Sequence, residues 1–104
     1  MRVAVPSSDR KLESPVDPRF GRSPYYIIIE TDTMNYDVLN NTRMSAPGGV
    51  EAAQLVAAEN IDVVLAGVIG PKSSKLLSEA GIKIIKGVRG SVREAVESFL
   101  KGDL

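Results

Sequence analysis

A long loop near the start of the chain constrains the fold more than any other segment. Residues 6–23 hold three prolines and one glycine, and they separate two apolar segments, 3–5 and 25–29. The apolar segments have the composition of buried strands. Loops of this length are uncommon inside a compact domain and are usually functional or disordered. We therefore expect this loop to contribute to a binding site.

Composition limits what a site in this chain can contain. The 104 residues are 43% hydrophobic, which suffices for one core, so we expect a single domain over 1–104. The chain has no Cys and no His, which excludes thiolate ligands and removes the commonest acid–base group. A net charge of zero gives no global attraction to nucleic acid or membrane. Without a signal-peptide pattern or an apolar run long enough to span a bilayer, we expect a cytoplasmic protein. We also expect it to be a monomer.

Hydrophobic periodicity and turn residues predict the order β-β-β-α-β-α-β-α. We expect strands over 2–6, 24–30, 36–39, 62–66 and 82–85, and helices over 50–59, 71–80 and 92–100. Ser91 and Glu94 have the spacing of a capping box at the start of the last helix. Gly81, followed by Ile82, is typical of a left-handed helix end.

This order of elements predicts the sheet. Strand–helix–strand units pair in parallel with a right-handed crossover, whereas the second and third strands form a hairpin. With the strands numbered along the chain, we expect the order 3-2-1-4-5, with strand 2 antiparallel and helices on both faces. This is a three-layer α/β domain of ribonuclease-H-like topology.

Ligands of open α/β sheets bind beyond the carboxyl ends of the parallel strands. Four segments should meet there, and we call them the rim: 7–23, 42–49, 67–72 and 86–91. They contain three acidic residues and eight basic ones, namely Arg10, Lys11, Arg19, Arg22, Arg43, Lys72, Lys86 and Arg89. Three helices should also begin near the rim and present unpaired N–H groups. The rim should therefore suit an anion.

Catalytic alternatives have little support in the residues. The first strand carries no carboxylate of the kind a metal-dependent nuclease places there. A hydrolase would need Asp9 and Asp62 within metal-bridging distance of each other. Without Cys or His there is no Cys-His or Ser-His pair, and Gly67–Gly70 with Lys72 lacks the spacing of a phosphate-binding Walker loop. We expect a non-catalytic binding protein.

Residues 17–26 read Asp-Pro-Arg-Phe-Gly-Arg-Ser-Pro-Tyr-Tyr. This motif resembles the segment HFGRAPYF of the dinitrogenase iron–molybdenum cofactor biosynthesis family. Residues 48–54 resemble its glycine-rich helix start, residues 61–71 its strand and Gly-Pro turn, and residues 81–85 with 92–95 its ending. The resemblance extends over essentially the whole chain and implies a ribonuclease-H-like fold.

The resemblance implies a carrier of iron–molybdenum cofactor or its iron–sulfur precursor, with a protein partner in cluster assembly. Family members often have His at the position of Arg19, so this chain would have to bind a cluster without His or Cys. The implied cofactor-binding residues are Arg19, Phe20, Gly21, Arg22, Gly48, Gly49, Gly70 and Lys72. Met44 offers a soft donor, although we expect it to pack in the core. The alternatives are a small-anion or nucleotide sensor, or a protein-interaction module, on the same fold.

Overall fold

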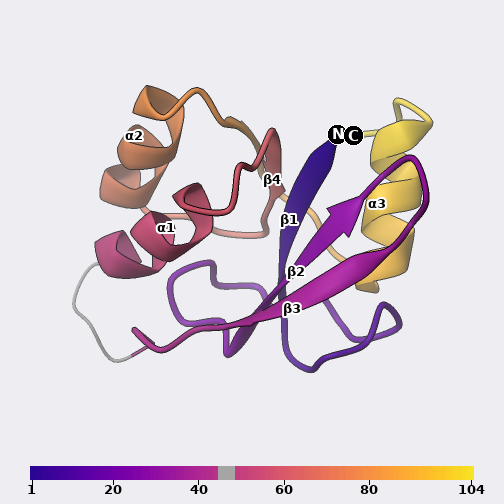
Figure 1. Cartoon of the computed structure of the whole chain (residues 1–104), viewed down its shortest axis with the longest axis horizontal. Helices are drawn as coiled ribbons and strands as arrows, with labels where there is room; N and C mark the ends of the chain where they lie inside the picture. Colours follow the sequence, from indigo (N-terminus) through magenta and orange to yellow (C-terminus); the bar gives the residue numbers. More distant parts are fainter. Residues whose placement is uncertain (45–48) are drawn as a thin grey trace.

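The computed structural model describes residues 1–44 and 49–104, and the elements follow the expected order (Figure 1). They are β1 (Arg2–Ser7), β2 (Tyr25–Glu30), β3 (Tyr36–Asn40), α1 (Val50–Ala57), β4 (Val63–Leu65), α2 (Pro71–Glu79), β5 (Lys83–Ile85) and α3 (Val92–Leu100).

The strands form one mixed sheet in the order β3-β2-β1-β4-β5, which confirms the predicted order. β2 runs antiparallel to both β1 and β3, whereas β1, β4 and β5 are parallel to one another. β1 therefore lies at the centre, and the long loop leaves its carboxyl end. Figure 1 shows this loop passing below the sheet, at the end remote from the two chain termini.

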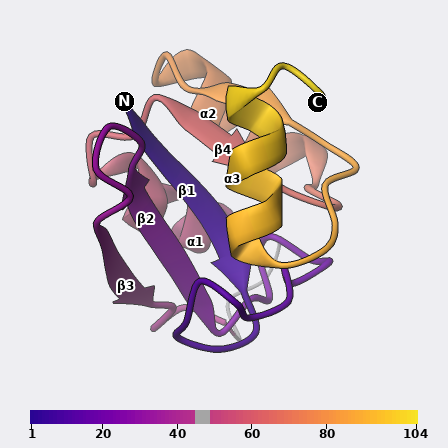
Figure 2. The same ribbon diagram turned by 90° about the vertical axis from the view of Figure 1, so that its right-hand side faces the viewer.

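Helices cover both faces of the sheet, with α1 and α2 on one face and α3 on the other (Figure 2). Successive residues of a strand point to opposite faces, so Ala4 packs in the core under α1 and α2 while Val3 and Val5 pack under α3. All three side chains are fully buried. Burying a Val side chain is worth about 1.5–3 kcal/mol, so β1 stabilises both cores at once.

The helix ends have the predicted chemistry. Gly81 adopts the left-handed conformation at φ 82°, and the N–H of Ile82 donates to the Leu77 carbonyl. Ser91 and Glu94 form the complete capping box of α3. None of the helices in the described ranges is long and apolar enough to cross a membrane.

Candidate functional site

The first half of the long loop is bound to the start of α3. The N–H of Val92 donates to the Ser14 carbonyl at 2.9 Å, and the N–H of Arg93 donates to the Leu12 carbonyl at 2.8 Å. Val16 in turn donates to the Gly90 carbonyl at 2.9 Å. The first N–H groups of α3 are therefore used within the protein, and they are not available to an anion.

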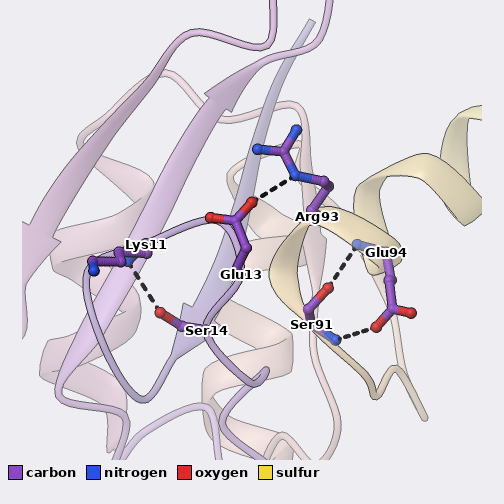
Figure 3. Close-up of polar contacts among 6 residues, drawn as sticks. All are labelled: Lys11, Glu13, Ser14, Ser91, Arg93 and Glu94. Atoms are coloured by element: carbon purple, nitrogen blue, oxygen red, sulfur yellow. Dashed lines mark hydrogen bonds and ion pairs between the residues drawn. The ribbon is translucent and has the colours of Figure 1, made fainter.

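Side chains complete this attachment (Figure 3). Glu13 accepts from Nε of Arg93 at 2.8 Å, and this hydrogen bond is the main reason that the pKa of Glu13 is lowered. Glu94 accepts from the Ser91 N–H at 2.9 Å, which is the main cause of its lowered pKa. The Ser14 hydroxyl accepts from the Lys11 N–H at 3.0 Å. Residues 11–16 thus act as a structural brace for α3.

The second half of the loop is bound to the segment after β4. Arg19 and Val68 form a parallel bridge, in which Phe20 donates to the Val68 carbonyl at 2.9 Å and Val68 donates to the Pro18 carbonyl at 2.8 Å. A Cβ on Gly67 would lie 2.9 Å from that Pro18 oxygen, so glycine is required there. This pairing places exposed Arg19 beside Val68, which is 67% exposed.

The same half of the loop contacts the start of α1. A Cβ on Gly21 would lie 2.9 Å from Cα of Gly49, and a Cβ on Gly49 would lie 3.2 Å from the Ser73 hydroxyl of α2. Gly49 is left-handed at φ 69° and is the N-cap of α1. Loop residues 17–23 and the first turns of α1 and α2 therefore meet at one place, the Gly21–Gly49 contact.

The helix starts at the rim differ in their capping. Gly49 of α1 and Gly70 of α2 provide no side-chain cap, whereas Ser91 caps α3. Our expectation that three helices present free N–H groups was wrong for α3, because the brace and the capping box use its first donors. The positive ends of α1 and α2 remain at the Gly21–Gly49 contact.

The basic side chains beside this contact are exposed and form no ion pair with any residue that the structure describes. Arg19, Arg22 and Lys72 are exposed, and none forms an ion pair within residues 1–44 and 49–104. Arg43 pairs with Glu51 at 3.6 Å, beside a shallow hollow on the outer face of α1. Exposed positive charges that form no ion pair in the part of the chain that the structure describes favour an anion.

Other rim residues have structural roles or different surroundings. The Phe20 side chain is 1% exposed and packs against the Tyr26 ring at 5.1 Å, so only its backbone borders the candidate site. Met44 is 40% exposed, so our expectation that it packs in the core was wrong. Gly48 lies outside the described residues. The guanidinium of Arg10 lies 5.2 Å from the Tyr25 ring centroid.

One residue of this region escaped the sequence analysis. Asn41 is 7% exposed, and its amide donates to carbonyls of the long loop. In the sequence it reads only as the second of two asparagines after a strand, a position typical of a turn. The only sequence signal for a role in the site was that Asn41 stands directly before rim segment 42–49, which contains Arg43.

The geometry argues against the hydrolase alternative. Asp62 accepts from the Arg2 N–H at 2.8 Å, at the start of β1, whereas Asp9 follows the end of that strand. A six-residue strand is about 20 Å long, given a rise of roughly 3.3 Å per residue. The two carboxylates therefore cannot share a metal. The described ranges also hold no group of three or more carboxylates that could bind a metal ion.

Comparison with known proteins agrees with this fold. The sequence matches the dinitrogenase iron-molybdenum cofactor family over residues 1–102. The apo form of the orange protein from Desulfovibrio gigas is 35% identical with a TM-score of 0.94, and the match covers 98% of this chain and 88% of that one. A Thermotoga protein described as NifB-like is 34% identical with a TM-score of 0.86, covering 98% and 89%.

One curated relative also matches the whole of this chain. An uncharacterised protein of Methanocaldococcus jannaschii is 28% identical over 109 residues, covering 100% of this chain and 89% of its own. The family match spans almost the whole sequence, and both solved relatives share its topology at more than 30% identity. The chain belongs to the dinitrogenase iron–molybdenum cofactor family.

Proposed function

We propose that this protein is a non-catalytic carrier of an anionic metal–sulfur cluster, either iron–molybdenum cofactor or its iron–sulfur precursor. The cluster is cargo, held at the Gly21–Gly49 contact and passed to a protein partner in cluster assembly. The observation that carries the proposal is a set of exposed basic side chains near the starts of α1 and α2, whose N-cap glycines provide no side-chain cap. These side chains form no ion pair within the described ranges, and they are Arg19, Arg22 and Lys72.

The hydrogen-bond donors at this site favour contact with the outer ligands of a cluster. They do not favour direct bonds to its metal ions. The chain has neither thiolate nor imidazole. Guanidinium and ammonium groups instead donate charge-assisted hydrogen bonds, which are about twice as strong as neutral ones. The N–H groups of Gly21 and Arg22 donate no hydrogen bond within the described ranges and are additional donors. The exposed thioether of Met44 is the one soft atom among the described rim residues.

The relatives support a cofactor-related role. The family is named for the iron–molybdenum cofactor, and one solved relative is described as NifB-like. The orange protein is described as an apo form, a term for a protein that also exists with a bound group. A binding site formed by loops and helix starts can accept and release such a group without a covalent bond.

Anaerobic gel filtration with purified iron–molybdenum cofactor, and separately with its iron–sulfur precursor, tests the proposal. We expect metal to co-elute with the wild-type protein at a fixed ratio. The variant Arg19→Ala with Arg22→Ala should lose most of that metal, because two charge-assisted contacts are removed.

A matched variant separates a local effect from a change of net charge. Lys83→Ala with Lys101→Ala also removes two exposed positive charges, but from the start of β5 and the end of α3. It should retain the metal of the wild type. Equal metal loss in both double variants, or no metal on the wild type, would count against a cluster site at the Gly21–Gly49 contact.

A further inference from the structure

Asn41 connects two of the rim segments, the long loop that carries Arg19 and Arg22 and the segment that carries Arg43. Its Nδ2 group donates to the carbonyls of Gly21 at 3.3 Å and Ser23 at 2.8 Å, and its Oδ1 accepts from the N–H of Arg43 at 2.9 Å. The neighbours dictate this orientation, because only a donor can face the two carbonyls and only an acceptor can face the N–H. The residue is 7% exposed, so these hydrogen bonds are shielded from water.

Tyr26 continues the same network. Its hydroxyl donates to the Phe20 carbonyl and accepts from Nδ2 of Asn41 at 3.2 Å. The Tyr26 side chain is fully buried in the core under α1 and α2, and burial raises the pKa of its hydroxyl, which therefore stays a donor. The core thus fixes the hydroxyl, the hydroxyl fixes one side of Asn41, and both residues hold the loop.

This network has an electrostatic consequence for the rim. The carbonyls of Phe20, Gly21 and Ser23 all point toward buried donors. A carbonyl oxygen carries partial negative charge and would repel an anion if it faced the rim surface. With these three oxygens turned inward, the exposed side chains of Arg19 and Arg22 can face an anion, as can the N–H groups of Gly21 and Arg22.

We infer that Asn41 and Tyr26 are positioning residues for anion binding, which withdraw the carbonyls of Phe20, Gly21 and Ser23 from the rim and set the distance between Arg22 and Arg43. This inference rests on the proposed function, because it concerns the same site. Neither residue contacts the ligand. Their contribution is a loop in which the carbonyls of Phe20, Gly21 and Ser23 are already hydrogen-bonded before the anion arrives.

Two uncharged substitutions test the inference. Asn41→Leu keeps the approximate shape and removes both the donors and the acceptor, whereas Tyr26→Phe removes only the hydroxyl. We expect about tenfold weaker anion binding for Asn41→Leu and about threefold for Tyr26→Phe, since buried carbonyls left without donors turn toward solvent. If Asn41→Leu does not fold, Tyr26→Phe still tests the inference.

A control variant must separate the loss of loop positioning from a general loss of protein stability. Val96→Ala removes two methyl groups from a fully buried side chain of α3, in the core on the other face of the sheet. It should lower the denaturation midpoint and leave anion affinity unchanged. Amide chemical shifts supply the second measurement. Those of Gly21, Arg22 and Arg43 should move in Asn41→Leu and Tyr26→Phe but not in Val96→Ala.

The probes are purified iron–molybdenum cofactor and inorganic pyrophosphate, titrated separately under anaerobic conditions. Weaker binding of either probe by the two variants, with Val96→Ala unaffected, supports the inference. Wild-type affinity in both variants overturns it and leaves the proposed function intact. If the wild type binds pyrophosphate but not the cofactor, the cluster role fails and the pyrophosphate affinities decide the inference. If the wild type binds neither, both proposals fall.

Discussion

Gly21→Ala tests whether the close approach of the loop to α1 defines the candidate site. The new Cβ would lie 2.9 Å from Cα of Gly49, and the clashing atom is backbone, so one of the two segments has to move. Overpacking of this kind costs roughly 1–3 kcal/mol. The smaller conformational freedom of alanine in the unfolded chain offsets about 0.4–1 kcal/mol. We therefore expect the free energy of unfolding to fall by about 1–2 kcal/mol.

Urea denaturation measures this loss, and thermal denaturation should show a midpoint lowered by about 5–15 °C. Anion binding should weaken as well, because the movement separates the loop from the starts of α1 and α2. Gly70→Ala is the matched control, since its φ is −71° and nothing lies within 4 Å of the added Cβ. Its stability should stay within about 0.5 kcal/mol of the wild type. A Gly21→Ala protein as stable as Gly70→Ala would refute the close contact.

Three further predictions concern α3 and its brace. Ser91→Ala should lower the free energy of unfolding by about 1 kcal/mol in urea denaturation, because it removes the N-cap acceptor for the Glu94 N–H; an unchanged midpoint would contradict this. Arg93→Ala should lower the free energy of unfolding by no more than about 1 kcal/mol at low salt, because its ion pair with Glu13 is exposed. This loss should become smaller at high salt, where exposed charges are screened. The pKa values of Glu13 and Glu94 are lowered from 4.5. The stability that these two carboxylates give the folded protein is therefore fully present above pH 4.5 and is lost as the pH falls through the lowered pKa values. With no His, the unfolding free energy should stay level between about pH 5 and 8, and Glu94→Gln should weaken its decline in acid.

The strand order and the helix ends could be predicted because each depends on local signals. The isoleucines of β2 indicate a strand buried on both faces, and the hairpin with β3 follows from a short connection. Ser91 with Glu94, and Gly81, mark helix ends by chemistry confined to a few residues. The crossover rule then leaves one natural place for β4 and β5.

The partners of the rim could not be predicted in the same way. Val92 and Ser14 are far apart in the sequence, and nothing in their residue types shows that one donates to the other. The hydrogen bonds of Asn41 to the loop likewise join residues 18 and 20 positions apart. Such contacts depend on how the loop folds back over the sheet, so the sequence could identify the rim but could not divide it into a brace and a candidate site.

The length of the loop is explained largely by packing. Leu12 and Val16 are buried in the core under α3, whereas Phe20 is buried in the core under α1 and α2. The loop therefore crosses the end of β1 from one layer to the other and closes both cores. Packing does not explain Arg19 and Arg22, which flank Phe20 on an anchored backbone and yet are exposed and form no ion pair within the described ranges. Backbone that is fixed in this way restricts where two like charges can lie, and a bound anion is the partner that would make this arrangement favourable.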